Sequence, residues 1–134
     1  MKLVFDIGFN VGKFTDVCLQ KSPDCKVVGI EANPSLCQYN KHSQNKSVKI
    51  INAIASNTDN DKKDFYVDPI NIGISTASEN FLKNSRFSKG SKYLEVDTGK
   101  WQHIGKIKTI TLDTLVSFYG KPDLIKVDVE GYEY

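Results

Sequence analysis

The stretch LVFDIGFNVG, residues 3–12, decides the fold. Its first five residues form an apolar run that is too short for a helix and ends at a glycine, which is typical of a buried strand. Apolar residues then recur at helical spacing from Phe14 until Pro23 ends the pattern. The stretch therefore predicts a strand that turns through Gly8 and Gly12 into a helix.

The alternation of strand and helix continues outward from this stretch. Residues 26–30 and 48–54 are apolar runs that predict two more buried strands. Between them, Asn33 and Pro34 supply an N-cap and a proline at the first helical position, so we expect a helix over residues 34–42. This alternation predicts an α/β fold with a mostly parallel sheet and helices on its faces.

The second half of the chain is less regular. We expect short strands over residues 63–67 and 106–111, and either an edge strand or a loop over residues 71–76. An amphipathic pattern predicts a helix over residues 112–119, and residues 123–129 predict a fourth buried strand. Because a sheet of this kind normally continues, we expect the chain to be truncated at its C-terminus.

Composition limits the classes of function. The chain has 134 residues, 40% of them hydrophobic and 25% charged, with a net charge of +2, as expected for one globular domain. No apolar run approaches about 20 residues, and Asp6 interrupts the first run, so we expect neither a membrane span nor a signal peptide. Cys18, Cys25 and Cys37 lack metal-ligand spacing, which favours reduced thiols and a cytoplasmic location.

Basic residues are concentrated in residues 83–108, which contain seven basic and two acidic residues. The net charge of this segment is therefore +5, and that of the rest of the chain is −3. We expect a basic, loop-rich insertion over about residues 80–105. The simplest interpretation of this segment is a solvated loop. Two functional alternatives stay open: a collar for an anionic acceptor such as a nucleotide sugar or acidic glycan, or an RNA-binding module, although nucleic acid is the less favoured partner. In either case Phe87, Tyr93 and Trp101 could stack on sugar or base rings.

The two histidines lie in unpatterned surroundings. His42 follows a polar, lysine-rich helix end and is expected to be exposed to solvent. His103, close to Trp101 in the basic segment, could serve as a second general base.

The glycine turn lies where open parallel sheets bind ligands, at the carboxyl end of a strand. The dinucleotide fingerprint GxGxxG is met only at Gly8, because Asn10 and Lys13 occupy the other two positions. A dinucleotide is therefore disfavoured. Gly8 and Gly12 could also serve only a tight turn. As a ligand site, the helix N-terminus after Gly12 would favour a carboxylate, and Asp6 an ammonium, directly or through water.

Glu31 follows the second strand, 19 residues after Gly12. A carboxylate at this place can accept both hydroxyls of a ribose and repels a 2′-phosphate, which predicts a nucleoside ligand. A solvated acid at a strand end is the alternative. Asn52 and Ala53, at the end of the third strand, are expected beside an adenine edge, and Ala32 is expected to pack on the ring.

Acids gather at the end of the fourth strand. The segment DLIKVDVEGYE, residues 123–133, places Lys126 inside a strand that should be apolar and Asp128, Glu130 and Glu133 beyond it. Lys126 and Asp128 share a face by alternation, so a structural ion pair is one interpretation. The other is the floor of an active site, where Asp128 or Glu130 takes a proton from an attacking hydroxyl and the acids could hold a divalent cation.

Several of these segments together resemble the FkbM family of S-adenosylmethionine-dependent methyltransferases, which are mostly O-methyltransferases of sugars and secondary-metabolite hydroxyls. They are residues 6–15, 29–34, 52–56, 111–115 and 123–133, and the last is the most specific. The resemblance implies a Rossmann-like class I methyltransferase domain over residues 1–134, with S-adenosylmethionine as cofactor and a small-molecule or glycan acceptor.

The resemblance also implies roles for the motifs. The turn from Asp6 to Gly12 would hold the methionine part of the cofactor, Glu31 its ribose, and Asn52 and Ala53 the adenine side. Members of the family continue through further strands that shape the acceptor pocket. A cofactor-binding fragment without catalysis is therefore the alternative to an active enzyme.

Overall fold

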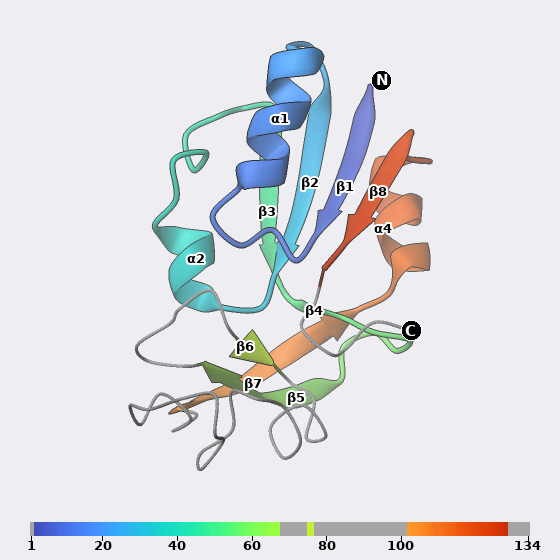
Figure 1. Cartoon of the computed structure of the whole chain (residues 1–134). Helices are drawn as coiled ribbons and strands as arrows, with labels where there is room; N and C mark the ends of the chain where they lie inside the picture. The colour runs from blue at the N-terminus through green and yellow to red at the C-terminus, as the bar shows by residue number, and fades with distance from the viewer. Residues whose placement is uncertain (1, 68–74, 77–101, 129–134) are drawn as a thin grey trace, which may run out of the picture.

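The computed structural model describes residues 2–67, 75–76 and 102–128. These residues form two four-stranded sheets, and the second lies beside the strand ends of the first (Figure 1). In the first sheet every pairing is parallel, and the order is β3-β2-β1-β8. Its strands are β1 (Leu3–Ile7), β2 (Lys26–Glu31), β3 (Val48–Asn52) and β8 (Leu124–Val127).

Helices cover both faces of the parallel sheet, because alternate residues of its central strands point to opposite sides. Phe5 and Ile7 of β1 pack in one buried cluster with Leu115 of α4 (Leu112–Tyr119). Val4 packs on the other face in a cluster with Cys18 of α1 (Lys13–Lys21). The predicted α/β fold with a mostly parallel sheet is thus confirmed (Figure 1).

The second helix, α2 (Pro34–Gln38), begins as predicted but ends earlier than residue 42. The Asn33 side chain accepts a hydrogen bond from the Ser35 N–H and Pro34 follows, so the N-cap prediction is confirmed. The Asn40 side-chain amide donates to the carbonyls of Leu36 and Cys37, which satisfies two of the last helical acceptors. This local bond explains why the helix stops before His42.

The second sheet has the order β4-β7-β5-β6, with β4 parallel to β7 and the other pairs antiparallel. Its strands are β4 (Ile54–Ala55), β5 (Lys62–Val67), β6 (Ser75–Thr76) and β7 (Gln102–Ile110). The single strand predicted over residues 48–54 is therefore divided between two sheets. Residues 102–105, predicted to belong to the loop-rich insertion, are instead strand, because they pair along β5. Residues 106–110 lie in β7, in agreement with the strand predicted over residues 106–111.

The second sheet packs against the carboxyl end of β2. Its buried cluster comprises Ile54, Phe65, Val67 and Ile107, and the half-buried Ala32, one residue beyond β2, packs against this cluster. The predictions for residues 71–74 and 80–101, and for Val129 and Glu130, lie outside the described residues. Within the described part of the chain, no helix has the length and apolar character needed to cross a membrane.

Candidate functional site

The candidate site lies at the carboxyl end of β1, between β2 and β8. The chain reaches β2 directly after β1 but returns to the other side of β1 only for β8, so the strand order reverses there. Open α/β sheets bind their ligands outside the strand ends at such a switch point. The backbone joins the three strands: Gly8 N–H donates to Ile30 O at 2.8 Å, and Asp128 N–H donates to Ile7 O at 2.9 Å.

The turn after β1 contains three residues with positive φ: Gly8 (+83°), Asn10 (+55°) and Gly12 (+88°). Glycine is required at the first position for a second reason, since a Cβ on Gly8 would overlap the carbonyl oxygen of Asp128. Phe9, between the glycines, points into the molecule and is only 1% exposed. The turn is thus tightly packed against the end of β8 and against the interior.

Glu31 lies beside this turn with its carboxylate fixed by the backbone. Asn10 N–H donates to Oε1 at 2.9 Å, and Asn33 N–H donates to Oε2 at 2.7 Å. The residue is 7% exposed, and burial raises the pKa of its carboxyl although these N–H groups act to lower it. Each carboxylate oxygen has a further lone pair, so the group can still accept hydrogen bonds from a diol.

The other residues predicted beside an adenine ring are held in place by the protein. The Asn52 side-chain amide donates to the carbonyls of Glu31 and Ala32, at 3.0 and 2.8 Å. Ala53 is buried in the cluster that α4 covers, and Ala32 packs on the second sheet. The three residues meet at the ends of β2 and β3, as predicted, and their contact with a ligand stays a prediction.

Asp6 is fully buried, and both of its carboxylate oxygens have partners within the chain. Thr15 Oγ1 donates to Oδ2 at 2.8 Å, and Lys126 Nζ lies 3.0 Å from Oδ1. Burial raises the pKa of the Asp6 carboxyl, against the lowering effects of Thr15 and Lys126. The Lys126 ammonium also donates to the carbonyl of Gly8, so it joins Asp6 to the turn. Contact of Asp6 with a bound ammonium stays a prediction.

Lys126 differs from the prediction in its partner. The structural interpretation paired it with Asp128, but its ammonium binds Asp6 on the neighbouring strand. Register explains this, because Asp6 and Lys126 are direct partners in the β1–β8 pairing, whereas Asp128 lies beyond the end of β8. The exposed Asp128 still lies against Gly8 through its backbone.

The N-terminus of α1 faces the same region. The helix begins after Gly12, and in the described residues no side chain caps it. Its first N–H groups therefore lack intrahelical acceptors, and the helix dipole places partial positive charge there. These groups are suited to bind a carboxylate, and that binding stays a prediction.

His42 does not lie at the surface, where its sequence context predicts it. It is buried rather than exposed, and its Nε2 lies 2.6 Å from Asp16 Oδ1 in the first turn of α1. No local pattern could reveal this contact, because 26 residues separate the two partners. His103 is exposed on the second sheet, where its Nε2 lies 2.9 Å from Asp64 Oδ1.

Other candidate ligands do not assemble in the described part of the chain. There, no group of three or more His, Cys, Asp or Glu side chains is placed to hold a metal ion. Cys18, Cys25 and Cys37 are free thiols, and burial raises the pKa of Cys37 to about 12. Glu130, predicted beside Asp128, lies outside the described residues.

Comparison with known proteins now gives the family. The family model of the methyltransferase FkbM domain matches residues 6–134. The chain belongs to this family. No curated protein and no solved structure gave a match. The resemblance stated from the sequence is thereby confirmed, and so is a Rossmann-like fold for this FkbM domain. Methyl transfer is the reaction class that this family supports.

Proposed function

We propose that this FkbM domain binds S-adenosylmethionine at the ends of β1 and β2 and methylates a hydroxyl of a sugar or small metabolite. The observation that carries the proposal is the buried Glu31 carboxylate, which the N–H groups of Asn10 and Asn33 hold beside the glycine turn. A buried acid held in this way, at a switch point, is suited to accept the two ribose hydroxyls of a nucleoside.

The polar groups of the site fit the polar parts of this cofactor. Its ribose diol needs two acceptors, and Glu31 supplies them on one rigid group. Its amino-acid carboxylate needs donors, and the start of α1 after Gly12 supplies N–H groups. NAD fits less well, because Asn10 occupies the position where the dinucleotide fingerprint has its second glycine.

S-adenosylmethionine supplies an electrophilic methyl group on a sulfonium. The chain's own task is to hold the acceptor in line with that methyl group and to remove the hydroxyl proton. Asp128 supports the second task, since its carboxyl group is exposed at the end of β8 and its backbone contacts Gly8. Lys126 supports the first, since it joins the turn at Gly8 to the buried Asp6.

Methyl transfer from labelled S-adenosylmethionine to a panel of sugars, nucleotide sugars and small hydroxyl compounds tests the proposal. We expect Asp128→Asn or Glu130→Gln to lower the transfer rate by about two to four orders of magnitude, the usual contribution of a general base. Melting temperature and affinity for S-adenosylhomocysteine should stay near those of the unmodified chain.

Two other results would change the assignment. Unchanged transfer rates in both variants would remove Asp128 and Glu130 from catalysis. Tight binding of S-adenosylhomocysteine without transfer to any acceptor would favour a cofactor-binding domain that needs further segments for activity.

A further inference from the structure

We infer that His42 is a positioning residue, which holds the glycine turn in the shape needed for the cofactor. The role toward the cofactor rests on the proposed function, whereas the contacts between His42 and the turn are present in the chain without any ligand. His42 lies in the connection between α2 and β3, so it reaches the turn from outside the segment that forms it.

The imidazole ring packs directly on the turn. A Cβ on Gly12 would come within 2.9 Å of His42 Cδ2, and within 2.9 Å of Phe9 Cζ. The rings of His42 and Phe9 meet edge to face, with centroids 6.1 Å apart and planes inclined by 82°. His42 thus fills the space that the missing side chain of Gly12 leaves open.

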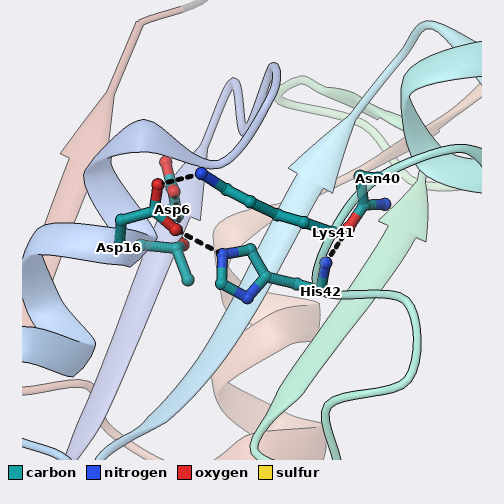
Figure 2. A network of polar contacts seen from close by, with 6 residues as sticks. Asp6, Asp16, Asn40, Lys41 and His42 are labelled. Carbon is teal, nitrogen blue, oxygen red and sulfur yellow. Dashed lines mark hydrogen bonds and ion pairs between the residues drawn. The ribbon is translucent and has the colours of Figure 1, made fainter.

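The ring is also held at its polar edge. His42 Nε2 lies 2.6 Å from Asp16 Oδ1, and Lys41 binds the other oxygen of Asp16 (Figure 2). Chiefly through its hydrogen bond with Lys41, this surrounding lowers the pKa of the Asp16 carboxyl, which keeps it ionised as an acceptor. Asp16 N–H in turn donates to Gly12 O at 2.9 Å, so the carboxylate and the turn are one unit.

The backbone of His42 is fixed as well, because its N–H donates to Asn40 Oδ1 at 2.8 Å (Figure 2). The same Asn40 side chain closes the end of α2. His42 therefore links α2, the turn and the first turn of α1. Gly8 and Gly12 adopt positive φ without steric cost but are flexible, and only Asn10 is strained there, so a link of this kind restricts the turn to one shape.

The experiment compares His42→Leu, which keeps apolar bulk but loses the bond to Asp16, with His42→Gln, which keeps an N–H donor. His103→Leu is the matched control, since His103 Nε2 has a similar contact, 2.9 Å from Asp64 Oδ1, on the second sheet. Two quantities are measured: hydrogen exchange at the amides of Gly12 and Asp16, and the dissociation constant of S-adenosylhomocysteine by calorimetry.

We expect His42→Leu to raise exchange at both amides and to weaken binding, each by about tenfold, the typical effect of one hydrogen bond to a charged group. His42→Gln should keep exchange at the two amides and the dissociation constant close to those of the unmodified chain. His103→Leu should change neither quantity. Exchange and affinity unchanged in His42→Leu would overturn the inference. So would a uniform rise in exchange across β1 and β2, because it would show only a general loss of stability.

The design separates this inference from the proposed function. If the unmodified chain does not bind S-adenosylhomocysteine, the proposed function fails, and exchange at Gly12 still decides whether His42 holds the turn. If His42→Leu does not fold, Asp16→Ala removes the same bond from the partly exposed partner and is judged by the same exchange criterion.

Discussion

Lys126 of β8 lies opposite Asp6 of β1, and its ammonium nitrogen is 3.0 Å from Asp6 Oδ1. The same ammonium donates to the carbonyl of Gly8 at 2.8 Å. One side chain thus joins the last described strand, a fully buried carboxylate and the turn of the candidate site. Substitution of Lys126 shows whether this ion pair stabilises the fold or takes part in the reaction.

We expect Lys126→Met to lower the free energy of unfolding by about 3–5 kcal/mol, because it leaves the buried Asp6 carboxylate without its cation. Lys41→Met is the control, since the Lys41–Asp16 pair is partly exposed and should cost about 1 kcal/mol or less. Urea denaturation measures both. The double variant Asp6→Asn with Lys126→Met should recover part of the loss. A fully stable Lys126→Met chain would refute the structural role.

Gly8→Ala should destabilise the chain more than Gly120→Ala. Both glycines have positive φ, +83° and +95°, so both substitutions strain the backbone. At Gly8 the new Cβ would also overlap a backbone atom, the carbonyl oxygen of Asp128, whereas at Gly120 no atom of the described residues lies within 4 Å of the new Cβ. Thermal unfolding compares the melting temperatures of the two variants. An equal decrease in both would show that the turn can move away from β8.

The raised pKa of Glu31 predicts how stability changes with pH. Since the folded chain keeps the proton where the unfolded chain releases it, near the ordinary pKa of 4.5, this group contributes stability below that pH and loses it as pH rises through the folded pKa. The stability of Glu31→Gln relative to the unmodified chain should therefore improve as pH rises from about 4 to about 7.

The matched control for this titration is Asp16→Asn. Asp16 has a lowered pKa, so its contribution has the opposite sign and is present above its ordinary pKa of 3.8. Relative to the unmodified chain, this variant should become less stable as pH rises. Because the Asp16 slope lies below its ordinary pKa of 3.8, urea denaturation must extend from about pH 2 to about pH 7 to measure both slopes. A flat slope for Glu31→Gln would mean that burial does not shift its titration.

Glu31 also predicts a ligand effect. Glu31→Ala removes the acceptors for a ribose diol and should weaken S-adenosylhomocysteine binding by roughly 2–4 kcal/mol. Glu31→Gln should lose less, because it keeps one acceptor oxygen. Calorimetry gives both values, and an unchanged dissociation constant in both variants would return Glu31 to a purely structural role between Asn10 and Asn33.

The parallel sheet and the glycine turn at the carboxyl end of β1 could be predicted from the sequence because their signals are local. Short apolar runs, the cap at Asn33 and the glycines of the first turn each act within a few residues. The length of α2 was wrong because a side-chain bond from Asn40, rather than periodicity, ends the helix. Only the second half of β7 could be predicted, over residues 106–111, because the pairing of its first half with β5, far away in the sequence, leaves no local signal.

The site could be predicted less completely than the fold. Alternation shows which face of a strand a residue lies on, but it does not show which neighbour lies across the sheet. Lys126 was therefore given the partner Asp128, two residues away, instead of Asp6, 120 residues away. The burial of His42 depends on Asp16 and on the space beside Gly12, and neither leaves a local signal.

The central claim is that the buried Glu31 and the glycine turn form a site for S-adenosylmethionine. Calorimetric titration of the chain with S-adenosylhomocysteine and, separately, with NAD tests it most directly. We expect saturable binding of S-adenosylhomocysteine that is tighter than any binding of NAD and is weakened by Glu31→Ala. Tighter binding of NAD, or no binding of S-adenosylhomocysteine by the folded chain, would contradict it.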